Sequence, residues 1–262
     1  MRLEENFGDS AEYARKLFTN LGRLLILIVL NFIPVVNFIV GGYMWRVVHD
    51  TPSSKDPPRL ERYGEMWVNG LKVVVASIIY MIIPIIIILV GAWELVARTM
   101  THGLQLRFLT PTGIITIFVG IIIAFFLSLI LAMGIVHMIK HNSFGQAFAF
   151  GEILSVIKKI GWGKYIAWVI VVFVIMIIVH AISGIPAIGW LISIVITPVF
   201  YVFVSRSAAL IYCDGAPEVC APAAPSIPTL PVSPPTGFGY CPICGEKLPE
   251  EATYCPKCGH KL

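Results

Sequence analysis

The chain contains 262 residues, and only 13% of them are Asp, Glu, Lys or Arg, whereas soluble proteins carry roughly 25%. The mean hydropathy is +0.85, and the formal net charge of +4 is small. These values exclude an ordinary soluble protein. A net charge this small also disfavours a dense basic face of the kind that nucleic-acid binding requires.

The first segment, residues 1–22, has the pattern of an amphipathic helix in which acidic and basic side chains are mixed. No small-residue cleavage motif follows the first apolar run, so we predict no secretory signal. The N-terminal stretch is mixed in charge, whereas a secretory signal begins with a basic region. Its charged residues include Arg2, Glu4, Glu5, Asp9, Glu12, Arg15 and Lys16.

Four long runs without Asp, Glu, Lys or Arg then follow, at 24–45, 73–93, 108–139 and 165–205. About 20 apolar residues in a helix cross a hydrocarbon core, so each run is long enough to span a membrane. The last run is long enough for two spans joined by a turn at residues 183–186. The sequence therefore predicts an all-α polytopic membrane protein with five or six membrane segments inside residues 23–212. The segments are expected near 24–48, 71–93, 112–138, 164–183 and 186–211.

The first of these segments is interrupted at Pro34, between Asn31 and Asn37. Proline removes a backbone donor and kinks or breaks a helix. Two alternatives are open: one kinked span, or a re-entrant hairpin with both legs on the same side of the membrane. A similar string around Pro186 lies at a predicted hairpin turn, which favours a hairpin here as well.

Two stretches before later spans have the amphipathic pattern of helices that lie in the membrane interface. Apolar residues occupy one face of each stretch, and charged or polar residues occupy the rest. The apolar faces consist of Leu60, Tyr63, Trp67 and Leu71 in the first stretch, and of Phe150, Ile153, Ile157 and Ile160 in the second.

The distribution of Lys and Arg predicts the orientation, because cytoplasmic loops carry an excess of these residues. The loop after the first segment and the loop after the third are rich in them, whereas the turn at 183–187 has none. Both loops and the C-terminal tail are therefore expected in the cytoplasm. The N-terminal stretch also carries basic residues and is therefore expected in the cytoplasm. It lies there only if the first segment is re-entrant.

Residues 213–239 are predicted to form a Pro-rich linker, because seven prolines lie between Ala216 and Gly239. Such a stretch favours extended, semi-rigid chain and cannot build a core. Cys213 and Cys220 flank its start at a spacing that matches no familiar metal site. We interpret them as incidental thiols.

The last segment, residues 240–262, has two CxxC pairs separated by ten residues: Cys241, Cys244, Cys255 and Cys258. This spacing is typical of a zinc ribbon built from two knuckles, with a short β-hairpin between them. We expect one structural Zn²⁺, because four cysteine ligands leave no open position. The alternative, two disulfides, is disfavoured for thiols expected in the cytoplasm.

The membrane segments contain few groups suited to chemistry. We find no catalytic constellation and predict that the protein is not an enzyme. His137 lies near a span end, where interfacial water is expected to satisfy it. Asn31, Asn37 and His180, with the helix interruptions expected at Pro34 and Pro84, are the residues that a membrane cavity would use.

Three strings resemble one membrane family: residues 33–43, residues 67–72 and residues 185–190. The family is domain of unknown function 4013, which is common in archaea and present in bacteria. The likeness covers roughly residues 10–214, and the tail resembles the zinc ribbons of many prokaryotic membrane proteins. The resemblance implies a multi-pass protein of the cell membrane and brings no catalytic residue.

The helical part of the protein is therefore expected to contact membrane lipids. The expected function of the ribbon is to bind an unknown cytoplasmic protein. No nucleic-acid partner is expected, because the ribbon's charges are balanced. The alternative is a transporter or channel-like protein for small molecules or lipids.

Overall fold

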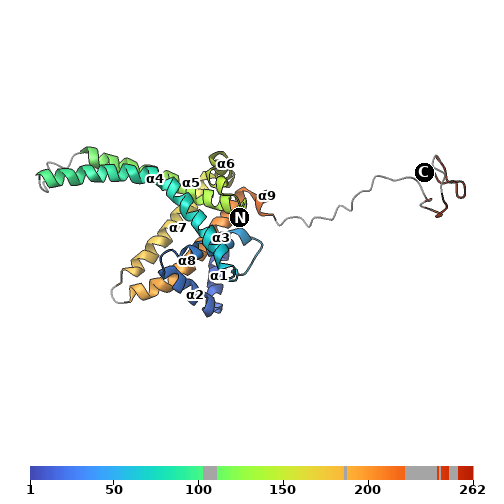
Figure 1. Cartoon of the computed structure of the whole chain (residues 1–262), viewed down its shortest axis with the longest axis horizontal. Helices are drawn as coiled ribbons and strands as arrows, with labels where there is room; N and C mark the ends of the chain where they lie inside the picture. Colours follow the sequence, from blue (N-terminus) through green and yellow to red (C-terminus); the bar gives the residue numbers. More distant parts are fainter. Residues whose placement is uncertain (103–110, 186–187, 222–240, 242, 248–252, 262) are drawn as a thin grey trace. The chain divides into compact units, whose positions relative to one another are not determined.

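The computed structural model describes residues 1–102, 111–185, 188–221, 241, 243–247 and 253–261. The chain divides into two compact units, Met1–Ala221 and Pro222–Leu262. The first unit is helical throughout its regular structure, and the second contains the ribbon (Figure 1). Residues 222–239 of the predicted linker lie outside the described residues.

Four helices of the first unit are long and apolar enough to cross a membrane. They are α4 (Tyr63–His102), α5 (Pro111–Lys140), α7 (Trp162–Ser183) and α8 (Gly189–Gly215). The helix α4 runs beside α5 and α7 packs against α8, so the spans form two hairpins (Figure 1). The chain is thus a membrane protein, and four of the predicted segments are confirmed. Helix α4 continues through Pro84, so the interruption expected there does not occur.

The first predicted segment is divided into two short helices, α2 (Leu21–Phe32) and α3 (Phe38–Asp50), with 12 and 13 residues. At 1.5 Å per residue each helix is roughly 20 Å long, too short for a hydrocarbon core of about 30 Å. Residues 33–37 form the turn, in which Val35 has a φ of 70°. Because Pro34 ends the first helix and the chain reverses, the structure favours the re-entrant alternative.

The two predicted amphipathic stretches have different outcomes. Residues 63–71 continue directly into α4 as one helix, so they do not form a separate element. The second stretch is a separate helix, α6 (Phe150–Ile160), which follows the short 3₁₀ helix η3 (Phe144–Phe148). Ile153, Ile157 and Ile160 of its apolar face are buried inside the protein, where α6 packs against α5 and α8, whereas Phe150 is exposed.

Helix α8 lies at the centre of the unit and contacts α1, α2, α3, α5, α6, α7 and α9. The N-terminal helix α1 (Leu3–Arg15), continued by the 3₁₀ helix η1 (Lys16–Thr19), packs on α8 with a polar face. Asn6 Nδ2 donates to the Ser207 carbonyl at 3.1 Å, and Ser207 Oγ contacts Asn6 Oδ1 at 2.5 Å. Trp168 Nε1 of α7 donates to Ser207 Oγ at 2.8 Å. These polar contacts, together with apolar contacts such as Phe7 with Phe203, hold the amphipathic N-terminal segment on α8.

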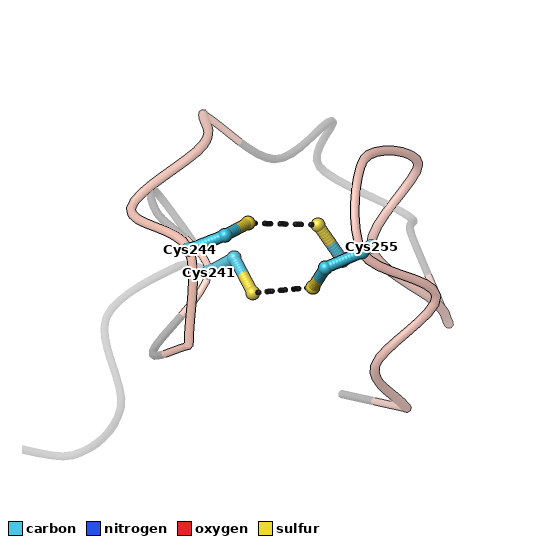
Figure 2. A group of neighbouring side chains, drawn as sticks. Cys241, Cys244 and Cys255 are labelled. Carbon is cyan, nitrogen blue, oxygen red and sulfur yellow. Dashed lines mark hydrogen bonds between the residues drawn. The ribbon is translucent and has the colours of Figure 1, made fainter.

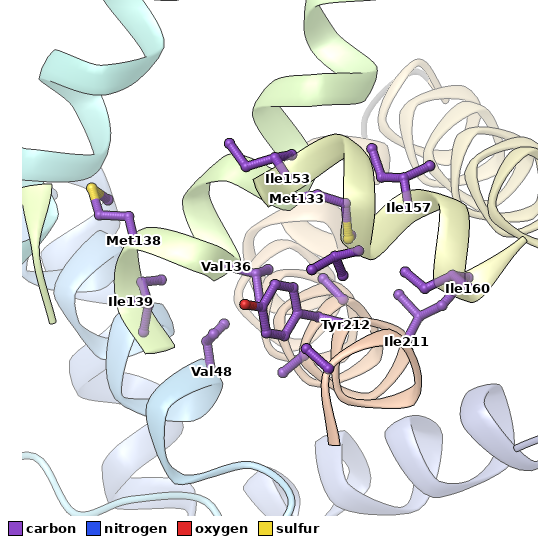
Figure 3. Packing of buried hydrophobic residues seen from close by; sticks show 14 of the residues in the cluster. Val48, Met133, Val136, Met138, Ile139, Ile153, Ile157, Ile160, Ile211 and Tyr212 are labelled. Carbon is purple, nitrogen blue, oxygen red and sulfur yellow. The ribbon is translucent and has the colours of Figure 1, made fainter. Parts of the chain in front are cut away.

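The main apolar core lies where the end of α5, α6 and the end of α8 meet (Figure 3). Met133 and Val136 of α5 pack with Ile157 of α6 and with Ile211 and Tyr212 of α8. This core fixes the last turns of α5 against α6, and that arrangement positions the second cluster described below.

The interpretation of Cys213 and Cys220 as incidental thiols is wrong. Helix α8 ends at Gly215 and the short helix α9 (Pro217–Cys220) begins two residues later. The chain therefore turns back on itself, which brings the two Cα atoms to 5.5 Å, and the sulfurs form a disulfide.

Candidate metal centre

The ribbon consists of two turns with matching backbone geometry. Gly245 N donates to the Cys241 carbonyl at 2.9 Å, and Gly259 N donates to the Cys255 carbonyl at 2.9 Å. The two glycines have φ values of 70° and 71°, a region that glycine adopts without strain. The expectation of two knuckles is confirmed.

The four sulfur atoms of the ribbon converge on one point between the knuckles (Figure 2). Cys241 Sγ lies 3.6 Å from Cys258 Sγ, and Cys244 Sγ lies 3.5 Å from Cys255 Sγ. All four lie within 4.8 Å of one another. Four thiolates bound tetrahedrally at about 2.3 Å from Zn²⁺ would be about 3.8 Å apart. The donor set therefore fits zinc, and these separations exclude disulfides between the paired sulfurs, for which about 2.05 Å is needed.

Backbone amides of the knuckles stabilise the thiolate form of the first cysteine in each pair. Hydrogen bonds from the N–H groups of Cys244 and Ile243 lower the pKa of Cys241 to about 6. The N–H groups of Cys258 and Lys257 likewise lower the pKa of Cys255. Because the thiolate is the form that binds a metal, the knuckles prepare both residues as ligands.

The rest of the ribbon supports the knuckles. Cys255 N donates to the His260 carbonyl at 2.8 Å, and Tyr254 forms an isolated antiparallel bridge with Lys261. His260 thus contributes its backbone, and its side chain is absent from the cysteine cluster. The described part of the ribbon contains this bridge rather than a strand, and residues 248–252, where the hairpin was expected, lie outside the described residues.

The other predicted site residues are not gathered into a site. Asn31 is half-buried and Asn37 is exposed in the turn region between α2 and α3. His180 is exposed on α7, where its Nδ1 lies 2.9 Å from the Met176 carbonyl. A cavity that uses these three residues stays a prediction.

The expectation for His137 is wrong. Its side chain is 3% exposed, and protein groups rather than interfacial water satisfy it. Nδ1 lies 2.6 Å from the hydroxyl oxygen of Tyr212. Nε2 lies 3.0 Å from Gln146 Oε1 and 3.1 Å from Glu152 Oε2. The cause is tertiary, because α6 and α8 close over the end of α5.

A comparison with protein families gives two matches. The family described as a protein of unknown function (DUF4013) matches residues 25–188, which is more than half of the chain. The chain belongs to the DUF4013 family. A zinc-ribbon domain matches residues 240–262. Neither the curated proteins nor the solved structures provide a match to this chain.

The DUF4013 match begins in α2 and ends at the connection between α7 and α8. It includes His137, His141 and Glu152, which the structure brings together. Sequence reasoning missed this cluster, although His137 and His141 have the four-residue spacing that places two side chains on one helix face. Glu152 lies on another helix, and its position carries no local signal.

Proposed function

We propose that this DUF4013 protein is a non-enzymatic, multi-pass protein of the cell membrane whose cytoplasmic ribbon binds one structural zinc ion and docks a protein partner. The closed four-cysteine cluster carries the proposal. Four thiolates fill the tetrahedral positions of zinc, which leaves none for a substrate. A segment of this size cannot fold by apolar burial alone, so the metal must supply its folding free energy.

The surface of the ribbon supports a docking role. Ile243 in the first knuckle is 67% exposed, and Tyr254 beside the second is 57% exposed. Large apolar side chains on so small a unit are available for contact with a partner. Lys257 and Glu246 form an ion pair across the knuckles at 2.5 Å. This charge balance disfavours nucleic acid as the partner.

The packing of the helical unit supports the cytoplasmic orientation. The N-terminal amine pairs with Asp214 at 2.7 Å near the end of α8, and Lys164 near the start of α7 contacts the same carboxylate. Two helical hairpins and a re-entrant pair return the chain to one side. The basic connections at 51–62 and 141–161 meet there as well, and the positive-inside rule assigns this side to the cytoplasm.

The orientation is tested by thiol labelling in whole cells with a membrane-impermeant maleimide. The variant Cys213→Ser/Cys220→Ser leaves only the ribbon thiols to react. We expect no labelling in intact cells treated with a membrane-impermeant zinc chelator, and labelling after permeabilisation in the same chelator. Labelling of the ribbon in intact cells would overturn the cytoplasmic assignment.

The docking role is tested by crosslinking in cells followed by purification of the full-length protein. The intact ribbon is compared with Cys244→Ser/Cys258→Ser, which removes the exposed ligand of each knuckle. Partners that are lost with the metal and retained by the Cys213→Ser/Cys220→Ser control would support docking. An identical set of partners with and without the zinc ligands would contradict it.

A further inference from the structure

The end of α5 and the start of α6 bring together a second group of metal-ligating side chains, separate from the ribbon. His137 lies in the last turn of α5 and His141 follows directly after the helix, and their ring centroids are 4.2 Å apart. Glu152 comes from α6. One ligand atom from each of the three side chains lies within 4.8 Å of the other two. We propose that His137, His141 and Glu152 bind a divalent first-row transition metal.

The contacts at Nδ1 of the two imidazoles allow Nε2 of each ring to carry the lone pair. His141 Nδ1 lies 3.0 Å from the His137 carbonyl, which accepts only from a protonated nitrogen, so Nε2 of His141 carries the lone pair. His137 Nδ1 lies 2.6 Å from the Tyr212 hydroxyl, which accepts equally well from Nδ1–H. A metal-bound histidine characteristically donates its other N–H to such a partner.

The surroundings of His137 Nε2 point to a cation at this position. Two oxygen atoms, Gln146 Oε1 at 3.0 Å and Glu152 Oε2 at 3.1 Å, face the same buried nitrogen. Either a proton on Nε2 or a metal ion satisfies this arrangement. When the metal binds, the ring proton sits on Nδ1 and the Tyr212 oxygen accepts it, so no buried nitrogen is left without a partner.

The cluster is accessible to an incoming ion. A cavity of about 300 Å³ is lined by the three proposed ligands, by Tyr212 and by Glu218. The Glu152 side chain is 62% exposed, whereas His137 is buried and fixed. Because one ligand is rigid and two are accessible to solvent, a metal ion can enter and leave this site. Two imidazoles and one carboxylate suit zinc, iron(II) or cobalt(II), and they leave at least one position open.

Metal binding at this site would join α6 to the end of α5. The consequence is a gain in thermal stability that depends on the metal and is independent of the ribbon. The site does not rest on the docking function proposed above, and either can fail without the other.

The test uses the full-length protein in detergent with all four ribbon cysteines changed to serine, so that only the second site can bind. Cobalt(II) is titrated into this variant, because its visible absorption distinguishes nitrogen–oxygen ligands from thiolates. We expect one equivalent of cobalt to bind, without a thiolate charge-transfer band, and to raise the melting temperature. Competition with zinc(II), iron(II) and manganese(II) then ranks the metals.

His141→Ala and Glu152→Gln are the test variants in this background, because both side chains are exposed and their loss leaves the core intact. We expect each to abolish stoichiometric binding and the metal-dependent rise in melting temperature. His180→Ala is the matched control, since His180 makes the same contact with the carbonyl four residues earlier. The proposal is overturned if the protein with the four ribbon cysteines changed to serine binds no cobalt, or if His141→Ala and Glu152→Gln bind as much as His180→Ala.

Discussion

Gly42 and Gly70 meet backbone to backbone where α3 packs against α4. A Cβ atom placed on Gly70 would lie 2.9 Å from the Gly42 nitrogen and 1.8 Å from the Phe38 carbonyl oxygen. A Cβ atom on Gly42 would lie 1.8 Å from the Met66 carbonyl oxygen. No L side chain fits these spaces, so helix α3 is held against α4 by close backbone contact, as small residues allow in membrane proteins.

The first prediction concerns this contact. Gly70→Ala is expected to separate α3 from α4 and to destabilise the protein by about 1–3 kcal/mol, because the clash is with backbone atoms that cannot rotate away. Thermal unfolding in detergent measures the loss. Gly64→Ala is the matched control in α4, since a Cβ atom there meets nothing within 4 Å. Equal stability of the two variants would contradict the close contact.

The second prediction concerns metal removal from the ribbon. Chelation, or the substitution Cys255→Ser, is expected to unfold residues 240–262, because zinc binding supplies on the order of 10 kcal/mol to such a fold. Limited proteolysis of the intact protein would then cleave within the ribbon and leave the helical unit undigested. A ribbon that resists protease equally well after chelation would refute the structural role of the metal.

The third prediction concerns Arg206, whose side chain is only 4% exposed. It pairs with Asp9 at 2.8 Å, donates to the Ser54 carbonyl at 2.8 Å and lies over the Tyr13 ring at 4.6 Å. Arg206→Leu is expected to cost about 2–4 kcal/mol, since Asp9, the Ser54 carbonyl and the Tyr13 ring lose one buried charged donor together.

The readout for Arg206→Leu is faster proteolysis within α1, together with a lower melting temperature. Lys158→Leu, an exposed position on α6, serves as the control and is expected to leave both unchanged. If α1 remains protected in Arg206→Leu, the charge pair does not hold α1 on α8.

The fourth prediction concerns Ser207, which joins α1, α7 and α8. Ser207→Ala removes the acceptor of Trp168 Nε1 and the hydroxyl that contacts Asn6 Oδ1. Leaving these buried groups unsatisfied is expected to cost about 1–3 kcal/mol in the free energy of unfolding. Ser155→Ala on the exposed face of α6 should change it by less than about 0.5 kcal/mol. A melting temperature for Ser207→Ala equal to that of Ser155→Ala would argue against the network.

Local patterns were sufficient for much of the architecture. Uncharged runs of membrane-spanning length predicted α4, α5, α7 and α8, because apolar length alone determines whether a helix can cross a bilayer. The spacing of Cys241, Cys244, Cys255 and Cys258 predicted the metal ligands, since each knuckle is a local turn. Pro34 marked the end of α2, but the choice between a kink and a reversal depends on what α3 packs against.

The sequence by itself therefore determined the membrane helices and the four-cysteine ribbon, which depend on contacts between near neighbours in the chain. The Cys213–Cys220 disulfide depends on the turn between α8 and α9, and only the tertiary structure decided that His137 is buried against Tyr212. The His137–Tyr212 contact joins residues 75 positions apart, and no local periodicity encodes such a distance. The second metal site is of this kind, because α6 must fold back onto α5 before Glu152 reaches the two histidines.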